Sequence, residues 1–154
     1  MASHSETMVR LLDGQDVPVL RGVLQTFAGA FEDSGTYLEN PPSDGYLEHL
    51  LRSDNFIALA AVRDAEVVGG LAAYELKKFE QERSEIYIYD LAVAKPCRRE
   101  GVATAMIDRL RGIARDRGAY VIYVQADVTD PPAIALYTKL GIREDVLHFD
   151  IAVE

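Results

Sequence analysis

The hydrophobic pattern between residues 56 and 126 changes its period twice, and this change limits what the chain can fold into. Three consecutive segments have the composition and alternation of strands, and they are Phe56–Val62, Glu66–Leu76 and Glu85–Val93. Apolar residues then recur at helical spacing from Val102 to Ala114, and Gly118 is placed to stop that helix. The segment Ala119–Ala126 returns to a strand pattern, and its nearly continuous apolar character predicts burial on both faces.

Five further elements are predicted on either side of this region. They are a strand at Val9–Leu12, a helix capped by Asp16 and running to Phe31, a short helix capped by Ser43, a helix from Asp130 through Leu140, and a final strand at Leu147–Val153. The order is strand, two helices, three strands, helix, strand, helix, strand. This order predicts one α/β domain over residues 1–154, with a central mixed sheet and helices on both faces.

Charge and cysteine usage exclude several classes of protein. The formal net charge of -9 opposes binding to nucleic acid and anionic membranes, and it attracts cations. The single cysteine, Cys97, excludes an internal disulfide, and the histidines show no metal-ligand spacing. Residues 1–7 do not resemble a signal peptide, and no apolar run is long enough to span a bilayer. We therefore expect a cytoplasmic protein without a metal.

A basic, glycine-containing turn stands where the third strand-like segment gives way to the helix. Its residues are Arg98, Arg99, Glu100, Gly101, Val102, Ala103 and Thr104. Unpaired N–H groups and the dipole at a helix start favour an anion. Gly101 lets the backbone approach a phosphate closely, and Ala103 keeps the helix start uncrowded. The turn is a candidate phosphate site, although an ordinary strand-to-helix turn would have a similar composition.

Two motifs resemble the signatures of the GNAT acetyltransferases. Arg98-x-x-Gly101-x-Ala103 follows Asp90-Leu91-Ala92-Val93, and a second match runs from Asp130 to Ile142. The resemblance implies the GNAT acyl-CoA N-acyltransferase fold and acetyl-CoA as cosubstrate. It implies that the turn binds the pyrophosphate and that main-chain groups of Leu91, Ala92 and Val93 hold the pantetheine arm. It also implies coenzyme contacts from the second match, at Asp130, Ala133, Leu136, Tyr137 and Lys139.

A narrower resemblance covers nearly the whole chain from about Val9. The matching stretches look like the type I aminoglycoside 3-N-acetyltransferases, which modify gentamicin and fortimicin, and they are Phe79–Gln81, Arg83–Val93, Ala119–Asp127, Ala135–Asp145 and His148–Ile151. This resemblance implies antibiotic resistance by direct acetyl transfer to a 3-amino group in a ternary complex. It also implies a homodimer.

Acetyl transfer to an amine needs a proton acceptor and a proton donor. Asp90, Glu85 and Asp127 are candidates for the general base, because each lies on or at the end of a predicted strand. Tyr137 occupies the position that serves as the general acid in the GNAT superfamily. An acyl-cysteine intermediate on Cys97 is disfavoured, because no histidine is placed to activate the thiol.

Carboxylates and tyrosines near the predicted strand ends are candidates for acceptor binding. They are Tyr74, Glu75, Glu85, Tyr89, Asp127, Glu144 and Asp150. Several carboxylates suit a polycation such as an aminoglycoside, because each ammonium group can meet one of them. Two alternatives stay open: a GNAT enzyme acting on polyamines or protein amines, and a non-catalytic acyl-CoA-binding protein.

Overall fold

The computed structural model describes residues 5–154, and the chain divides into two compact units. The first unit extends to Tyr123, and the second runs from Val124 to Glu154. Because the chain divides in this way, a single domain over residues 1–154 stays a prediction. In the part of the chain that is described, no helix is both long and apolar enough to cross a membrane.

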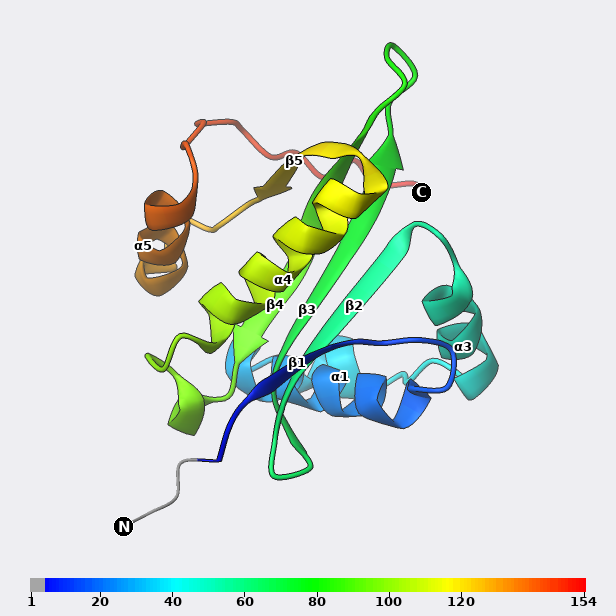
Figure 1. Ribbon diagram of the computed structural model, residues 1–154, viewed down its shortest axis with the longest axis vertical. Coiled ribbons are helices and arrows are strands. Elements are labelled where there is room, and N and C mark those ends of the chain that lie inside the picture. The colour runs from blue at the N-terminus through cyan, green and yellow to red at the C-terminus, as the bar shows by residue number, and fades with distance from the viewer. Residues whose placement is uncertain (1–4) are drawn as a thin grey trace. The chain divides into compact units, whose positions relative to one another are not determined.

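A five-stranded sheet forms the centre of the first unit (Figure 1). Its strands follow one another in the order β1 (Met8–Leu11), β2 (Phe56–Arg63), β3 (Glu66–Lys77), β4 (Ser84–Val93) and β5 (Ala119–Val124). The first three pairs of neighbours are antiparallel. The helix α4 (Val102–Arg117) joins β4 to β5, which is the crossover that parallel neighbours require, so the sheet is mixed.

Three helices and one short turn complete the first unit. They are α1 (Val17–Phe31), α2 (Ser34–Leu38), α3 (Asp44–Arg52) and the 3-10 turn η1 (Lys95–Cys97). Ser43 caps α3 as predicted, because its hydroxyl accepts a hydrogen bond from the Tyr46 N–H. Asp16 stands at the start of α1 but does not cap it. Its carboxylate instead accepts hydrogen bonds from the Asp13 N–H and the Arg10 guanidinium.

Two adjacent glycines on β3 bring a helix close to each face of the sheet. A Cβ atom on Gly70 would overlap Val23 of α1, whereas a Cβ atom on Gly69 would lie 3.2 Å from Met106 of α4. Successive residues of a strand point to opposite faces, so α1 and α4 cover opposite faces of the sheet. The predicted α/β architecture, with helices on both faces, is confirmed.

The core of the first unit lies between the sheet and these helices. Its largest fully buried side chains are Val23, Phe27, Ile57, Leu59, Leu71, Ile86, Met106 and Leu110. They come from α1, β2, β3, β4 and α4, so each helix packs its apolar stripe against the sheet. Along β4, buried residues alternate with partly exposed ones from Ser84 to Ile88, and Ala92 and Val93 at its end are buried.

A β-bulge interrupts β4 immediately before the segment matched to coenzyme binding. Ala73 pairs with Ile88, but the next residue of β3, Ala72, pairs with Asp90, so Tyr89 is the extra residue. A bulge bends its strand and redirects side chains. Tyr89 is exposed as a result, while Asp90 beside it is half-buried.

The second unit contains one helix, α5 (Pro131–Leu140). The predicted helix start at Asp130 is confirmed, and the Asp130 carboxylate caps the helix by accepting a hydrogen bond from the Ala133 N–H at 3.2 Å. Residues 141–154 form no helix or strand, and no residue from 125 to 154 is buried. The unit therefore has no fully buried side chain of its own.

Two predictions about strands are wrong. Ala119–Ala126 is not buried on both faces: β5 lies at the end of the strand order, and Tyr120 and Val121 on it are 48% and 39% exposed. Leu147–Val153 alternates apolar and polar residues but forms no strand, because a strand needs hydrogen-bonded neighbours that its own pattern cannot supply. The short helix α2 was not predicted, because five residues carry no measurable hydrophobic period.

Candidate functional site

The N-terminus of α4 is built to receive an anion. Gly101 precedes the helix in the left-handed conformation, with φ 80°, and no side chain caps the helix. The first intrahelical hydrogen bond runs from the Ala105 N–H to the Gly101 carbonyl. The N–H groups of Val102, Ala103 and Thr104 are therefore left for another partner. A Cβ atom on Gly101 would meet nothing within 4 Å, so no other part of the chain crowds the glycine itself.

The charged residues of the turn have different roles. Arg98 donates a hydrogen bond from Nε to the Val93 carbonyl at 3.0 Å, which ties the turn to the end of β4. Glu100 pairs with Arg63 of β2 at 2.7 Å, and the same guanidinium donates to Thr7. Arg99 is exposed and has a left-handed backbone, with φ 64°. Arg63 therefore anchors the turn, while Arg99 is the cation of the turn most open to a ligand.

The end of β4 lies directly before this turn. Leu91, Ala92 and Val93 pair with Leu71, Gly70 and Gly69 of β3. The Ala94 N–H then donates to the Val68 carbonyl, so the ladder continues to the start of η1. This pairing holds the main chain of Leu91–Val93 in one extended conformation, as a pantetheine-binding segment requires.

Asp90 is the carboxylate that the fold places nearest to this segment. Its Oδ1 atom accepts a hydrogen bond from the Tyr37 hydroxyl at 3.1 Å. Burial raises the pKa of the Asp90 carboxyl above its ordinary value, and the hydrogen bond from Tyr37 opposes that shift. A raised pKa makes Asp90 a better proton acceptor than an exposed aspartate would be.

Aromatic rings surround Asp90 on the same face of the unit. Tyr74 and Tyr89 meet edge to face with ring centroids 6.0 Å apart, and Tyr87 meets Tyr89 at the same distance. Tyr37 packs against Phe31 with centroids 5.8 Å apart. Rings of this kind offer apolar faces and hydroxyl groups to a sugar. The predicted acceptor residues Tyr74 and Tyr89 are therefore brought together with Asp90.

Glu75 and Glu85 are held by other side chains. Glu75 accepts hydrogen bonds from Ser84 at 2.7 Å and from Arg117 at 2.9 Å. Burial raises the pKa of Glu75, but these hydrogen bonds outweigh it and leave the pKa below its usual value. Glu85 accepts a hydrogen bond from the Tyr120 hydroxyl at 3.1 Å, and Lys78 lies 3.7 Å away. Both carboxylates thus have internal partners.

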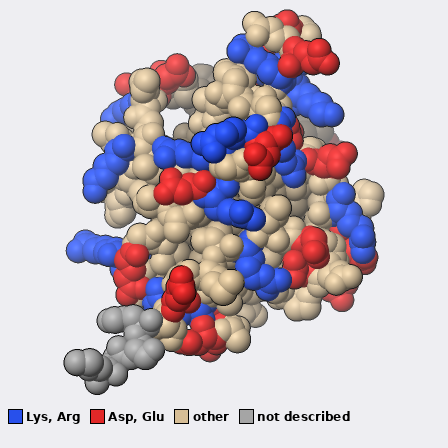
Figure 2. Space-filling model, in the orientation of Figure 1, with Lys and Arg blue, Asp and Glu red and all other residues tan. Residues whose placement is uncertain are grey.

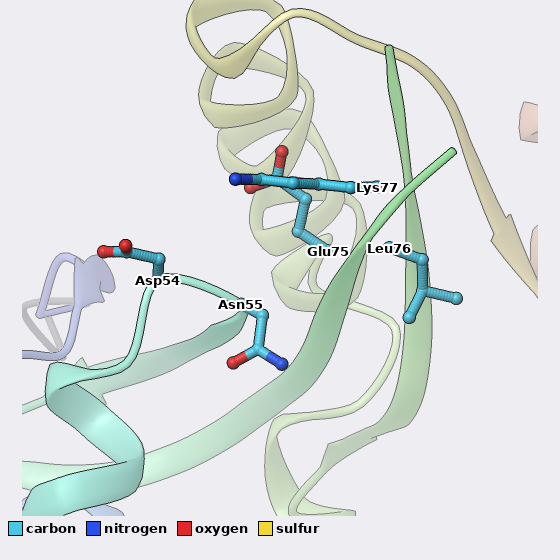
Figure 3. A pocket seen from close by; sticks show the side chains of 5 residues that line it. All are labelled: Asp54, Asn55, Glu75, Leu76 and Lys77. Carbon is cyan, nitrogen blue, oxygen red and sulfur yellow. The ribbon is translucent and has the colours of Figure 1, made fainter. Parts of the chain in front are cut away.

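A pocket of about 460 Å³ opens beside Glu75 (Figure 3). It is lined by Asp54, Asn55, Glu75, Leu76 and Lys77. Arg117 donates hydrogen bonds to both Glu75 and the Asp54 carbonyl, so the C-terminus of α4 braces this pocket. Of the two acidic side chains that line the pocket, that of Glu75 is paired with this arginine.

The remaining predicted residues belong to the second unit. Ala133, Leu136 and Tyr137 are half-buried on α5, and Lys139 is exposed. Burial, with a smaller contribution from the charge of Asp130, raises the pKa of Tyr137 to about 12. The phenol therefore keeps its proton at neutral pH. Asp127 and Glu144 are exposed, and Asp150 pairs with His148 at 2.9 Å.

Acidic and basic side chains are interspersed on the face of the molecule shown in Figure 2. The helix α4 alone carries four arginines and two aspartates. The acidic excess of the chain therefore lies in other segments. Among residues 5–154, no group of three or more histidine, cysteine, aspartate or glutamate side chains could hold a metal ion.

Sequence patterns did not identify Tyr37 or Arg63 as site residues. Tyr37 is 53 residues away from Asp90 along the chain, and Arg63 is 37 residues away from Glu100. Neither belongs to a motif, and α2, which carries Tyr37, is too short to have a recognisable pattern. Only the fold brings these pairs together.

The bulged strand β4 and the glycine-led start of α4 carry the first of the two motifs that resemble GNAT signatures. The sequence profile of the acetyltransferase (GNAT) family matches residues 23–142. The chain therefore belongs to this family and is an N-acetyltransferase of GNAT type. The family generally uses acetyl-CoA.

Individual solved structures and relatives within the family are also similar to this chain. An aminoglycoside acetyltransferase from an uncultured soil metagenomic sample is 60% identical, with a TM-score of 0.95 over 97% of this chain and 99% of that one. A second such enzyme from soil, in complex with sisomicin, is 27% identical, with a TM-score of 0.90 over 96% of this chain and 97% of that one. The N-alpha-acetyltransferase of Saccharolobus solfataricus is 30% identical over 120 residues, which are 71% of this chain and 69% of that protein.

Proposed function

We propose that this chain acetylates the 3-amino group of aminoglycoside antibiotics with acetyl-CoA, by direct attack in a ternary complex. The observation that carries the proposal is the 60% identity, over 97% of the chain, to an aminoglycoside acetyltransferase. The choice of the 3-amino group rests on the resemblance of the sequence to the type I enzymes. Resistance to the antibiotic would follow, because an acetylated amine loses its positive charge.

The turn before α4 fits the diphosphate of coenzyme A. The N–H groups of Val102, Ala103 and Thr104 have no intrahelical partner, and the exposed Arg99 adds a positive charge. The straight main chain of Leu91–Val93 suits the pantetheine arm. Bound acetyl-CoA supplies the acetyl thioester. In the second unit, Asp130, Ala133, Leu136 and Lys139 are the proposed additional contacts.

Asp90 is the proposed general base. The attacking amine must lose a proton as its nitrogen forms the new bond to the acetyl carbon, and the half-buried Asp90 carboxylate can accept it directly or through a water molecule. Its raised pKa suits this role better than the exposed environment of Asp127 or the internally paired state of Glu85.

Tyr137 is the proposed proton donor to the departing thiolate. Its pKa of about 12 keeps the phenol protonated over the working pH range. A thiol has a pKa near ~8.5, so complete transfer from such a phenol is uphill. Tyr137 therefore stabilises the developing sulfur anion by donating a hydrogen bond. Transfer of that proton to sulfur would leave a tyrosinate, which recovers a proton through solvent as the amine releases one, so the thiol departs neutral and the protons balance.

Recognition of the polycation is assigned to carboxylates and tyrosines. Tyr74 and Tyr89 offer ring faces beside Asp90. Asp127, Glu144 and Asp150 are exposed carboxylates of the second unit, and they are proposed to meet further ammonium groups. Glu75 and Glu85 contribute to the negative potential while they keep their internal partners.

A homodimer is also proposed. The tail residues Leu147, Phe149, Ile151 and Val153 are 84%, 77%, 89% and 99% exposed. Their alternation would place all four side chains on one face of a strand. Contiguous exposed apolar residues of this kind mark protein–protein contact sites, and a second copy of the same chain is the partner that the resemblance implies.

The second candidate function is acetylation of protein N-termini. It is favoured by the 30% identity to the N-alpha-acetyltransferase of Saccharolobus solfataricus. A peptide acceptor offers one ammonium group, whereas an aminoglycoside offers several, so the two candidates differ in how strongly salt weakens acceptor binding.

The deciding experiment measures thiol release from acetyl-CoA with three acceptors: sisomicin, spermidine and a peptide with a free N-terminus. We expect turnover with sisomicin, a KM for it that rises between 50 and 500 mM salt, and a product acetylated at the 3-amino group by NMR. Turnover with the peptide alone would overturn the aminoglycoside proposal. Coenzyme A binding without turnover on any acceptor would favour a non-catalytic acyl-CoA-binding protein.

A further inference from the structure

The hydroxyl of Tyr37 reaches the one carboxylate that the proposed reaction needs. Tyr37 lies on α2, and its hydroxyl oxygen is 3.1 Å from Oδ1 of Asp90 on β4. In the described part of the chain, residues 5–154, the Asp90 carboxylate accepts its hydrogen bond from this hydroxyl. We propose that Tyr37 is a positioning residue, which orients the Asp90 carboxylate and sets its basicity for proton removal from the acceptor amine. The inference rests on the proposed role of Asp90 as the general base.

Tyr37 can only act as a donor in this pair. Burial, and then the nearby charge of Asp90, raise the pKa of the Tyr37 phenol well above its ordinary value. The hydroxyl therefore remains protonated wherever the enzyme works, and it always has a proton to donate to Oδ1. The second oxygen, Oδ2, is left to accept the proton of the amine. A fixed donor on one oxygen limits rotation of the carboxylate and holds the other oxygen in one place.

The ring of Tyr37 is itself held in place by packing. Its centroid lies 5.8 Å from that of Phe27, which is buried on α1, and 5.8 Å from that of Phe31. Asp33 caps α2 by accepting a hydrogen bond from the Thr36 N–H at 3.0 Å. The short helix is thus fixed at its start by Asp33 and through its aromatic ring by α1. The hydroxyl is thus presented to β4 by a helix that is held at both its start and its aromatic ring.

The bulge in β4 explains why Asp90 needs such a partner. The extra residue, Tyr89, breaks the regular alternation of the strand and is exposed. Asp90 follows it and pairs with Ala72, so the ladder holds its backbone, while the bulge changes the direction in which its side chain leaves the strand. The hydrogen bond from Tyr37 then fixes the orientation of the carboxylate from a different element.

The effect of Tyr37 on the titration of Asp90 has a defined sign. Burial raises the pKa of Asp90, and the hydrogen bond from Tyr37 lowers it. Removing the hydroxyl should therefore raise the Asp90 pKa further. The other titratable groups around this pair are Tyr74 on β3, Tyr87 and Tyr89 on β4, and Asp33 before α2. All of them remain in a Tyr37→Phe variant, so the change belongs to one hydroxyl.

The test is the Tyr37→Phe variant, which keeps the ring and its packing. We expect the Asp90 carboxyl, followed by carbon NMR and assigned by comparison with Asp90→Asn, to titrate about half to one pH unit higher. We expect kcat to fall about three- to thirtyfold, with little change in coenzyme A affinity. The matched control is Tyr120→Phe, which removes a hydroxyl–carboxylate hydrogen bond of the same length, 3.1 Å, to Glu85. It should leave the Asp90 titration unchanged.

The outcomes separate this inference from the proposed function. If Asp90→Asn retains most of its turnover, Asp90 is not the base and the proposed mechanism fails. If Asp90→Asn is inactive but Tyr37→Phe keeps both the wild-type titration of Asp90 and its kcat, only the positioning role of Tyr37 is overturned. A loss of thermal stability in Tyr37→Phe without a shift in the titration would also overturn it, because a merely structural role predicts that result.

Discussion

At the scale of single residues, the glycines at the two ends of α4 share a left-handed backbone conformation, but only the first lies at the proposed coenzyme site. Gly101 before the helix and Gly118 after it both have positive φ, 80° and 75°, and a Cβ atom on either would meet nothing within 4 Å. A non-glycine residue in this conformation costs roughly 1–2 kcal/mol. The same substitution should therefore cost a similar free energy of unfolding at both glycines. Only Gly101 lies at the proposed diphosphate site.

We expect Gly101→Ala to weaken coenzyme A binding about tenfold or more, because strain at this position turns the N–H groups of the turn away from the diphosphate. Gly118→Ala should lose similar stability, yet bind coenzyme A as tightly as the wild type. Isothermal calorimetry with coenzyme A, together with thermal unfolding of both variants, makes the comparison. Equal coenzyme affinities in the two variants would remove the turn from the proposed site.

At the scale of elements, the adjacent glycines of β3 decide how closely the helices approach the sheet. Gly70 faces Val23 of α1, which is fully buried, and Gly69 faces Met106 of α4. β3 is also the strand against which β4 forms its bulge, so a displaced helix would disturb the neighbourhood of Asp90. Close packing at these two positions therefore supports the geometry of the site.

Gly70→Ala should destabilise the protein by about 1–3 kcal/mol, because the added methyl group overlaps Val23 in a packed core. The control is Gly112→Ala within α4, where a Cβ atom meets nothing within 4 Å. That change should stabilise the helix by up to about 1 kcal/mol. Urea unfolding midpoints give both values. Adding Val23→Ala to Gly70→Ala should recover part of the loss if the overlap is its cause.

At the scale of the whole molecule, residues 141–154 form a tail whose apolar side chains stay exposed. These residues have no regular secondary structure, and five of their apolar side chains are more than three-quarters exposed, including the four that alternate from Leu147 to Val153. Burying a side chain of this size contributes roughly 1.5–3 kcal/mol. Four of them provide enough apolar surface to support self-association.

We expect the wild-type protein to be a dimer in solution by light scattering coupled to size exclusion. The double variant Phe149→Ser/Ile151→Ser should be a monomer or dissociate at a concentration at least a hundredfold higher, because it loses two apolar contacts per chain. His148→Ser, on the opposite side of the alternating pattern, should remain dimeric. A wild-type monomer at high concentration, or an unchanged dimer in the double variant, would contradict this prediction.

Local sequence determined most of the elements and the chemistry of the turn. The helix starts at Ser43 and Asp130, and the helix stop at Gly118, follow from hydrogen bonds or conformations within a few residues, so a pattern can reveal them. The motif around Gly101 is equally local, and it predicts the helix start that the structure shows without a side-chain cap.

The tertiary structure alone decided the interactions that join distant segments. The hydrogen bond from Tyr37 to Asp90 and the exposure of β5 depend on which elements become neighbours, and no short-range period encodes that choice. The tail is a further example. Its alternating pattern indicates which side chains would be buried together, but not which segment would cover them. Strand formation needs a partner's backbone groups, and a partner is a property of the fold or of the assembly.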